Sequence, residues 1–347
     1  MLNRLASAAD PTRIRHAILS LWRGPGYEPL PEHVEIVHLR DAHTGIPDAV
    51  AAVRATGGVP DIVHGWVSHA SIVAAGVSAV FGTPLVLRQP TNIEKELVYE
   101  QQNISVHWRE LRIAFGAADT VIVPSPAIVE GTRRVYGASR IAIIPNGIDV
   151  DVAGPWRVPR RSHDPVVLGF VGRLCPQKDP IGLLTALATL PPTIDWRLEM
   201  CGEGPLRRDV ERFISTSGLT RRVALVGFDP DWRRRLHTWH TFLFPTRYEG
   251  MSNALLEAAA AGVPIVTSDI AENRAVLTPE RECLMASLDD PVGMGRQIAR
   301  LARDPSLAAA LGRRARRRAR QFTLGALVSA HEALYLQLSP GRTDRAA

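Results

Sequence analysis

Two glutamates, Glu249 and Glu257, stand eight positions apart in the segment YEGMSNALLEAAAAGVPIVTSD, which begins at Tyr248. Glu249 follows an apolar run that predicts a strand, and Glu257 falls inside an Ala-rich stretch that predicts a helix. Ser252 is a favourable N-cap for that helix, and Gly262 ends it. A carboxylate on each side of a helix start frames free amides that attract a phosphate. The alternative is an exposed Glu249 and a Glu257 held in a helix salt bridge.

Two cations, Arg173 and Lys178, follow another strand-like run in GFVGRLCPQKDP, residues 169–180. An arginine binds a phosphate through two parallel hydrogen bonds, and a lysine adds a point charge, so the pair could clamp a phosphate. A solvated loop is the alternative. The turn Gly202-Glu203-Gly204-Pro205 lies between a strand and a helix, and its glycines permit close backbone approach. An ordinary strand–helix turn explains it equally well.

The elements that must position these residues alternate between strands and helices. Short β-branched, apolar runs predict strands, and the segments between them have a helical pattern, which together indicate βαβ units and parallel sheets covered on both faces. In the first half we expect strands at 14–21, 34–39, 61–66, 84–89, 120–125 and 141–146, and helices at 46–56, 69–82, 106–118 and 126–137.

A Pro-, Gly- and Arg-rich stretch at 150–165 predicts a linker, after which a second α/β series begins. The fold class is therefore α/β, with two doubly wound, Rossmann-like domains that face each other across a cleft and place ligands at the carboxyl ends of their strands. In the second half we expect strands at 166–172, 195–202, 222–228, 241–246 and 264–269, helices at about 180–190, 205–217, 230–237, 253–261 and 270–277, and a long helical region at 291–337.

Composition is ordinary for a globular protein: 347 residues, 46% of them hydrophobic and 22% charged. No run of about 20 apolar residues predicts a membrane span, and the N-terminus lacks the order of a signal peptide. Three widely spaced cysteines, Cys175, Cys201 and Cys283, argue against a disulfide framework or a zinc site. We expect a cytoplasmic protein without a metal.

The net charge is +6, and arginines gather at Arg233–Arg235 and in GRRARRRAR, residues 312–320. Such clusters form a solvated helix face or bind an anionic membrane surface. Nucleic acid is the less favoured partner because no aromatic residue alternates with the arginines to stack on bases.

Motifs spread over nearly the whole chain resemble the retaining glycosyltransferases of the GT-B fold, in family 4 (glycosyl transferases group 1). The most specific are IPNGID and PTRYEGMSNALLEAAAAGVPIVTSD. The resemblance implies an acceptor-side domain at 1–152, a nucleotide-sugar domain at 153–322, and a helix crossing back to the first domain at 323–347. The matching segments are 60–66, 144–149, 170–179, 202–206, 226–228, 245–269 and 314–335.

By this resemblance, Arg173 and Lys178 stabilise the leaving diphosphate and Glu249 contacts the donor sugar. Glu257 binds the ribose hydroxyls. The reaction implied is metal-independent transfer, with no cofactor, from a nucleotide-diphosphate sugar to a glycan, lipid-linked or small-molecule acceptor, as in polysaccharide biosynthesis. The other donor-binding residues implied are Gly202, Glu203, Gly204, Leu206, Gly227, Phe228, Gly250, Met251, Ser252, Asn253, Ala254 and Leu255.

The acceptor side is where the chain departs from the family. Family members open with a strand and a Gly-rich loop, whereas this chain begins with MLNRLASAAD, which resembles the helix after that loop, so we expect the first strand of the N-terminal domain to be missing. Gln89 stands where many members carry a histidine. His64, Gln89 and Asn146 are the acceptor-side candidates.

Two other functions remain open. A degenerate homologue would bind a nucleotide sugar with little or no turnover, in keeping with Gln89 and the missing strand. A sugar-nucleotide epimerase would share the fold but needs acidic and histidine groups in the first domain. The expected location is cytoplasmic, with peripheral contact with the inner face of the membrane as an open alternative.

Overall fold

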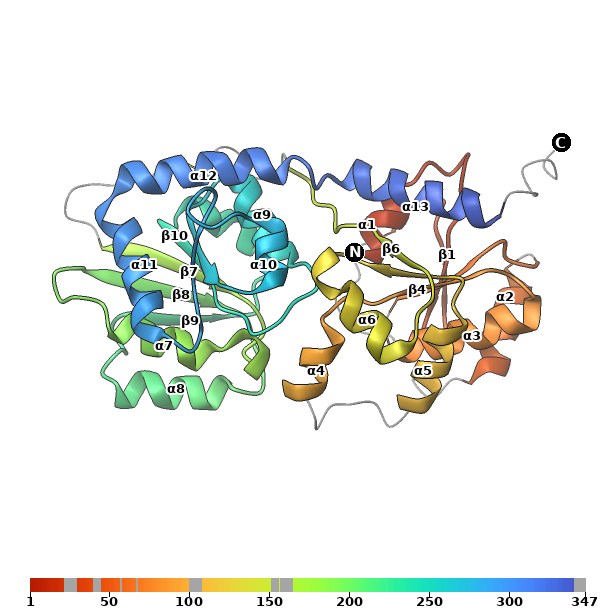
Figure 1. Cartoon of the computed structure of the whole chain (residues 1–347), viewed down its shortest axis with the longest axis horizontal. Coiled ribbons are helices and arrows are strands. Elements are labelled where there is room, and N and C mark those ends of the chain that lie inside the picture. Colours follow the sequence, from red (N-terminus) through yellow and green to blue (C-terminus); the bar gives the residue numbers. More distant parts are fainter. Residues whose placement is uncertain are drawn as a thin grey trace. The chain divides into compact units, whose positions relative to one another are not determined.

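A computed structural model describes residues 1–21, 30–39, 45–56, 58–66, 68–99, 108–150, 156 and 165–339. The chain divides into two compact units. Unit 1 comprises Met1–Gly147 with Leu324–Ala347, and unit 2 comprises Ile148–Thr323. Unit 1 is therefore built from both ends of the chain (Figure 1).

Unit 2 contains a six-stranded sheet in the order β12-β11-β10-β7-β8-β9. Every pair of neighbouring strands is parallel. The loops after β10, β7, β8 and β9 therefore emerge side by side at the carboxyl edge of the sheet. The strands are β7 (Val166–Val171), β8 (Trp196–Cys201), β9 (Val223–Gly227), β10 (Thr241–Phe244), β11 (Ile265–Ser268) and β12 (Leu284–Ala286).

Helices cover both faces of this sheet because alternate side chains of each strand point to opposite faces. Leu243 of β10 joins the core beneath α7, α8 and α11, whereas its neighbours Phe242 and Phe244 join the core beneath α9, α12 and η4. The helices are η3 (Pro176–Lys178), α7 (Pro180–Ala188), α8 (Arg207–Thr216), η4 (Trp232–His237), α9 (Asn253–Ala261), α10 (Ala271–Val276), α11 (Pro291–Arg303) and α12 (Pro305–Ala319).

The described strands of unit 1 form two parallel sheets, β1-β2 and β3-β4-β5-β6. Leu19 of β1 and Val63 of β3 pack against one hydrophobic cluster formed with α2 and α3, so the same helices hold both sheets. The strand expected to be missing stays a prediction. The strands are β1 (Ala17–Ser20), β2 (Glu35–His38), β3 (Val63–Gly65), β4 (Leu85–Arg88), β5 (Thr120–Val123) and β6 (Ile141–Ile143).

The last described helix, α13, is part of unit 1. Its Leu327 and Val328 lie in a core with Leu5 of α1, Val86 of β4 and Ile122 of β5. The opposite face of the four-stranded sheet packs against α3, α5 and α6. The helices of unit 1 are α1 (Leu2–Ala8), α2 (Ile46–Ala55), α3 (Ser68–Phe81), α4 (Ile93–Tyr99), α5 (Trp108–Ala117), η2 (Pro126–Ile128), α6 (Val129–Tyr136) and α13 (Leu324–Leu338).

Each of the eleven predicted strands is present, although most are shorter by a residue or more at their ends. Three described elements were not predicted: α4, η3 and β12. The last two have three residues each, too few to give a periodic signal. The helical region expected at 291–337 is three helices, because Asp304 caps α12 through Leu307 and Pro305 opens that helix. Most of the predicted linker at 150–165 lies outside the described residues.

Candidate active site

Three loops at the carboxyl edge of the unit 2 sheet are joined backbone to backbone. The Leu174 amide donates to the Glu203 carbonyl at 2.9 Å, the Leu206 amide donates to the Leu174 carbonyl at 2.9 Å, and the Gly202 amide donates to the Gly227 carbonyl at 2.7 Å. A Cβ at Gly202 would lie 1.9 Å from the Gly172 carbonyl oxygen, so only glycine permits this approach. The two Gly-containing motifs therefore form one rigid rim.

Lys178 and Glu249 form an ion pair at this edge. The two residues come from loops after the adjacent strands β7 and β10, and their side chains are only 14% and 9% exposed. The Thr246 hydroxyl donates to Glu249 Oε1 at 2.7 Å, and Lys178 Nζ lies 4.7 Å from the centre of the Phe244 ring. Two of the three predicted catalytic charges, Lys178 and Glu249, are thus fixed by packing and by each other.

Gln177 joins the two loops and was not identified from the sequence. Its Nε2 donates to the Tyr248 carbonyl at 2.9 Å, and its own carbonyl accepts from the Arg247 amide at 2.8 Å. Arg247 also pairs with Asp179 at 3.0 Å. The available signal was its place inside the GRLCPQKD motif, next to Lys178.

The start of α9 has the predicted cap. Ser252 Oγ accepts from the Leu255 amide at 3.3 Å, and Gly262 ends the helix in the left-handed conformation at φ 82°. Among the amides expected at this helix start, that of Leu255 is already used by the cap. Gly250 and Met251 are buried before the helix, and Asn253 and Ala254 are half-buried in its first turn.

Glu257 is buried inside α9 and pairs with Arg233 of η4 at 2.8 Å. Arg233 is 31% exposed and lies over the Trp232 ring, with its guanidinium carbon 5.6 Å from the ring centre. The sequence grouped Arg233 only with a surface cluster. Its partner is 24 residues away in the chain, so local patterns give no sign of the contact.

Three further donor-side candidates, Arg173, Glu203 and Phe228, are exposed. Arg173 is exposed, and Glu203 pairs with Arg207 on α8. Phe228, directly after β9, is 79% exposed, which is unusual for a large aromatic side chain. An exposed ring beside a glycine at φ 82°, Gly227, provides a flat apolar surface at the edge of the site.

In unit 1, two of the acceptor-side candidates, His64 and Asn146, belong to a polar layer with Arg88 and α13. Arg88, at the end of β4 and 3% exposed, donates from Nη2 to Asn146 Oδ1 at 2.6 Å and lies 5.1 Å from the Trp66 ring centre. His64 Nδ1 is 2.7 Å from the Tyr335 hydroxyl of α13. Gln89 is buried and donates to the Thr91 carbonyl at 2.9 Å, so its amide nitrogen is used within the loop.

Burial controls the charges of this layer. It lowers the pKa of His64 well below its usual range, lowers the pKa of His331 to about 4, and lowers the pKa of Arg88 to about 10. Both histidines are therefore neutral near pH 7. Arg88 Nη1 and the Nε2 atoms of His64 and His331 are buried without a hydrogen-bond partner.

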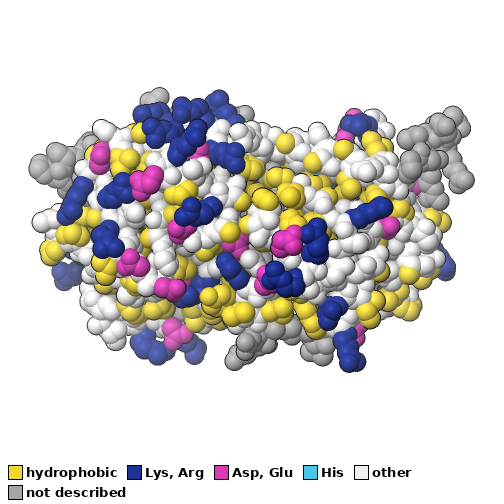
Figure 2. Space-filling view, viewed as in Figure 1, with side chains coloured by type: hydrophobic (Ala, Val, Ile, Leu, Met, Phe, Trp, Pro, Cys, Tyr) yellow, Lys and Arg dark blue, Asp and Glu magenta, His cyan; other side chains and the backbone are white. Residues whose placement is uncertain are grey.

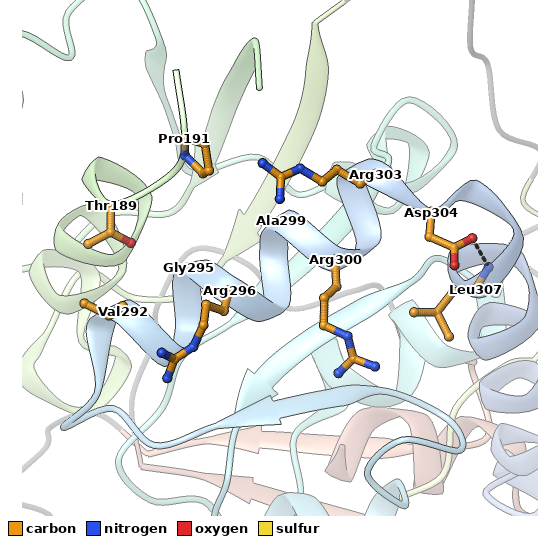
Figure 3. A pocket seen from close by; sticks show the side chains of 10 residues that line it. All are labelled: Thr189, Pro191, Val292, Gly295, Arg296, Ala299, Arg300, Arg303, Asp304 and Leu307. Carbon is orange, nitrogen blue, oxygen red and sulfur yellow. Dashed lines mark hydrogen bonds between the residues drawn. The ribbon is translucent and has the colours of Figure 1, made fainter. Parts of the chain in front are cut away.

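A cavity of about 600 Å³ lies elsewhere on unit 2 and contains none of the predicted site residues. It lies along α11, with arginine side chains around an apolar floor (Figure 3). The predicted catalytic residues lie on loops at the carboxyl edge of the sheet and do not line this cavity, so the cavity does not mark the active site. Its lining residues are Thr189, Pro191, Val292, Gly295, Arg296, Ala299, Arg300, Arg303, Asp304 and Leu307.

Across the part of the chain that the structure describes, no three histidine, cysteine or acidic side chains gather as metal ligands. Within the same part, no helix combines the length and the apolar character needed to span a bilayer. All three cysteines are buried and free. Burial raises the pKa of Cys201 to about 11 and that of Cys283 to about 12, so these two thiols are protonated near pH 7.

Family models match both halves of the chain. "Glycosyltransferase Family 4" matches residues 31–152, and "Glycosyl transferases group 1" matches residues 165–304. The Escherichia coli UDP-Gal:alpha-D-GlcNAc-diphosphoundecaprenol alpha-1,3-galactosyltransferase is 26% identical over 275 residues. The match covers 75% of this chain and 64% of that enzyme, so the chain spans less than two thirds of that relative's length.

Solved structures share the fold. Sucrose-phosphate synthase from Thermosynechococcus elongatus superposes with a TM-score of 0.82 at 21% identity, covering 97% of this chain and 92% of that one. Anabaena Alr3699/HepE, in complex with UDP and glucose, gives a TM-score of 0.80 at 20% identity, covering 97% and 94%. With two parallel α/β units, a capped helix between two glutamates and both family models matched, the chain belongs to glycosyltransferase family 4 (group 1) and has the GT-B fold.

Proposed function

We propose that this protein is a retaining glycosyltransferase that moves a sugar from a nucleotide-diphosphate donor to a glycan or lipid-linked acceptor. The observation that carries the proposal is the Lys178–Glu249 pair, which lies beside the capped start of α9 at the carboxyl edge of the unit 2 sheet. A cation for phosphate and a carboxylate for hydroxyls lie in direct contact there. That is the combination that a nucleotide sugar requires at the bond to be broken.

On the donor side, each charged group has a ligand group to match. The diphosphate takes Lys178 and the exposed Arg173, and the sugar hydroxyls take Glu249. Glu257, held by Arg233, accepts from the ribose hydroxyls. The base lies against Phe228, whose exposed ring offers a stacking surface.

Binding exchanges one set of ionic contacts for another. Without a ligand, Lys178 and Glu249 neutralise each other, which stabilises two charges in a largely buried place. A donor supplies an anion to the lysine and hydroxyl donors to the glutamate, so neither charge is left unpaired. The donor therefore fits into the contacts that already hold the site together.

Transfer breaks the bond between the anomeric carbon and the phosphate oxygen. Negative charge grows on the diphosphate as the sugar becomes oxocarbenium-like, and Lys178 and Arg173 stabilise that charge with the help of the amides at the start of α9. In a retaining reaction the departing phosphate takes the proton of the attacking acceptor hydroxyl. This chemistry requires neither a side-chain nucleophile nor a divalent cation.

The names of two relatives support the proposed acceptor class. The E. coli relative is named for an acceptor on diphosphoundecaprenol, and a Campylobacter jejuni relative, 25% identical over 251 residues, is named for a diphospho-undecaprenol acceptor as well. An acceptor on a lipid carrier places the reaction at a membrane surface. We therefore include peripheral contact with an anionic membrane in the proposed function.

The test is calorimetric binding of UDP-, GDP- and ADP-sugars, followed by donor turnover with and without a lipid-linked acceptor. We expect one donor to bind and to be consumed, and Glu249→Gln to reduce turnover by on the order of a hundredfold or more, since preorganised contacts to the reacting group carry effects of that size.

Glu280→Gln is the matched control, because Glu280 is a 58% exposed carboxylate of unit 2 paired with Arg300. It should leave turnover unchanged. Binding without turnover would identify a degenerate, nucleotide-sugar-binding homologue. Failure of all three donors to bind would overturn the proposal, and so would full activity of Glu249→Gln.

A further inference from the structure

Helix α12 carries an unusual concentration of positive charge. Six of the eight residues at 313–320 are arginines, and no Asp or Glu occurs from Pro305 to Arg320. Figure 2 shows Lys and Arg side chains gathered over this helix. The exposed members are Arg313, Arg314, Arg317 and Arg320, and Arg281 is exposed beside Arg314, whose Nη1 approaches the Arg281 carbonyl at 3.5 Å.

The fold does not need most of these arginines. The inner face of α12 is made by Leu311, Ala315 and Ala319, which are at most 1% exposed. Arg318 has a clear structural contact, because its guanidinium donates to the Val276 carbonyl at 3.2 Å and lies 5.4 Å from the Phe322 ring centre.

The other arginines repel one another, since like charges three and four positions apart on a helix destabilise it. Elsewhere in unit 2, arginines on α8, α10 and α11 pair with carboxylates. Among the described residues, Arg313, Arg314, Arg317 and Arg320 have no carboxylate within ion-pairing distance. A surface whose positive charges are not neutralised within the protein is complementary to an anionic partner.

We propose that the surface formed by Arg281, Arg313, Arg314, Arg317 and Arg320 docks on an anionic lipid bilayer. Clusters of four to eight basic side chains on a helix have the charge density that binds acidic lipid headgroups. A bilayer also fits better than nucleic acid, because the stretch from Pro305 to Arg320 has no aromatic side chain to stack on bases.

The placement of α12 connects this surface to the candidate active site. Its Gly312 lies against Gly262, where α9 ends, so closely that a Cβ on Gly312 would lie 2.1 Å from the Gly262 carbonyl oxygen. Helix α9 has nine residues, which span about 14 Å, and it begins at Ser252 beside Glu249. The inference deepens the proposed function, on which it rests for a lipid-borne acceptor: the docked surface lies one short helix from the donor site.

The experiment is cosedimentation of the full chain with vesicles of phosphatidylcholine alone and of phosphatidylcholine containing about a third phosphatidylglycerol. We expect binding only to the anionic vesicles, and weaker binding at high salt because salt screens exposed charges. The triple variant Arg313→Gln, Arg314→Gln, Arg317→Gln should bind on the order of a hundredfold more weakly, since each arginine near the surface contributes roughly a factor of five.

The matched control is Arg208→Gln, Arg212→Gln, Arg221→Gln, which removes the same charge from exposed positions of the same unit. It should bind vesicles like the unaltered protein. Thermal unfolding and calorimetric donor binding of both variants keep folding and the proposed function as separate readouts. A donor that binds while vesicles do not would overturn this inference alone.

Three results would overturn the docking surface: no binding of the unaltered protein to anionic vesicles, equal losses in the two triple variants, or tighter binding of the same arginines to a single-stranded oligonucleotide than to vesicles. Failure of the unaltered protein to bind any donor would instead contradict the proposed function. The vesicle result would still decide whether the arginine surface docks on a bilayer.

Discussion

In unit 2 the charged side chains at the sheet edge pair with opposite charges, Lys178 with Glu249 and Glu257 with Arg233. In unit 1 the buried cation Arg88 has an amide and an aromatic ring for partners, and no carboxylate among the described residues. Its neighbours His64 and His331 are kept neutral by burial. The charges at this edge of unit 2 are therefore held in ion pairs, whereas burial keeps the two histidines of the unit 1 layer uncharged.

The difference indicates different tasks. Ion pairs at a loop edge can be exchanged for the charges of a ligand at little electrostatic cost, because each partner finds a replacement. The layer under α13, with one cation among neutral histidine rings, has no such replacement and holds a helix against a sheet. Substitutions in unit 2 should therefore change turnover, and substitutions in the layer of unit 1 should change stability.

The largest effect is expected from Lys178→Gln. Removing the cation proposed to meet the leaving diphosphate should lower kcat by about a hundred- to a thousandfold, because charge on the leaving group is then less stabilised in the transition state. Steady-state kinetics with the bound donor measure it. Arg274→Gln, at an exposed pair with Asp269, is the control and should leave kcat unchanged. Equal kcat values in the two variants would contradict a catalytic role for Lys178.

Acid should destabilise unit 1 through His331. Its pKa is about 4 in the fold, below the ordinary value of 6.5, so the unfolded chain binds a proton first as the pH falls. The contribution of His331 to the free energy of unfolding is fully present above pH 6.5. It is lost as the pH falls toward 4, by up to about 3 kcal/mol. The charges of Arg88 and His16 also lower the pKa of His331. His331 in turn contributes to the lowered pKa of His64.

The measurement is urea unfolding between pH 7.5 and 4.5, with His331→Gln beside the unaltered protein. The variant should lose part of the acid sensitivity, whereas His33→Gln, at an exposed histidine of unit 1, should keep all of it. If the free energy of unfolding of His331→Gln depended on pH as steeply as that of the unaltered protein, burial of His331 would not be the cause of the acid sensitivity.

A smaller effect is expected at the helix cap. Ser252→Ala removes the acceptor for the Leu255 amide and should cost about 1 kcal/mol of stability. Asp290→Ala removes the corresponding cap of α11, where Asp290 Oδ1 accepts from the Gly293 amide at 2.8 Å. It should cost a similar amount of stability. Only the Ser252 variant should also weaken donor binding by calorimetry. Parallel behaviour of the two caps would contradict a donor contact at α9.

The smallest effect is expected from Phe228→Ala. Losing a stacking surface should raise KM for the donor about three- to tenfold and leave kcat nearly unchanged. Because the side chain is 79% exposed, thermal stability should not fall. A loss of kcat equal to the rise in KM would place Phe228 nearer to the reacting bond than the base pocket.

The sequence predicted the fold class and each strand it named, because period, length and β-branched composition are local properties. It also placed the Ser252 cap and the Gly262 stop correctly, since these depend on neighbours within a helix turn. The closeness of Lys178 and Glu249 was not predicted, because it depends on β7 and β10 being neighbours in the sheet, and strand order is not a local property. Nothing in those patterns showed that the two charges satisfy each other when no ligand is bound.

Contacts between distant segments could not be predicted in this way. Arg233 reaches Glu257 from a short 3₁₀ helix, and His64 meets Tyr335 across 271 positions of sequence. The division of the last helical region was missed although Asp304 and Pro305 carry the signal for it, because the helical pattern on both sides is continuous. Buried polar layers of this kind depend on packing, for which one sequence holds no direct signal.

The membership of α13 in unit 1 has a consequence for the order of folding during synthesis. Unit 2 ends at Thr323, so its last residue leaves the ribosome before Leu327 and Val328, which complete the core under β4 and β5. Domains generally fold as units while the chain emerges. The domain that is second in sequence is thus the first to have all its residues, and the growing chain must hold an unfinished unit 1 through the synthesis of about half the protein.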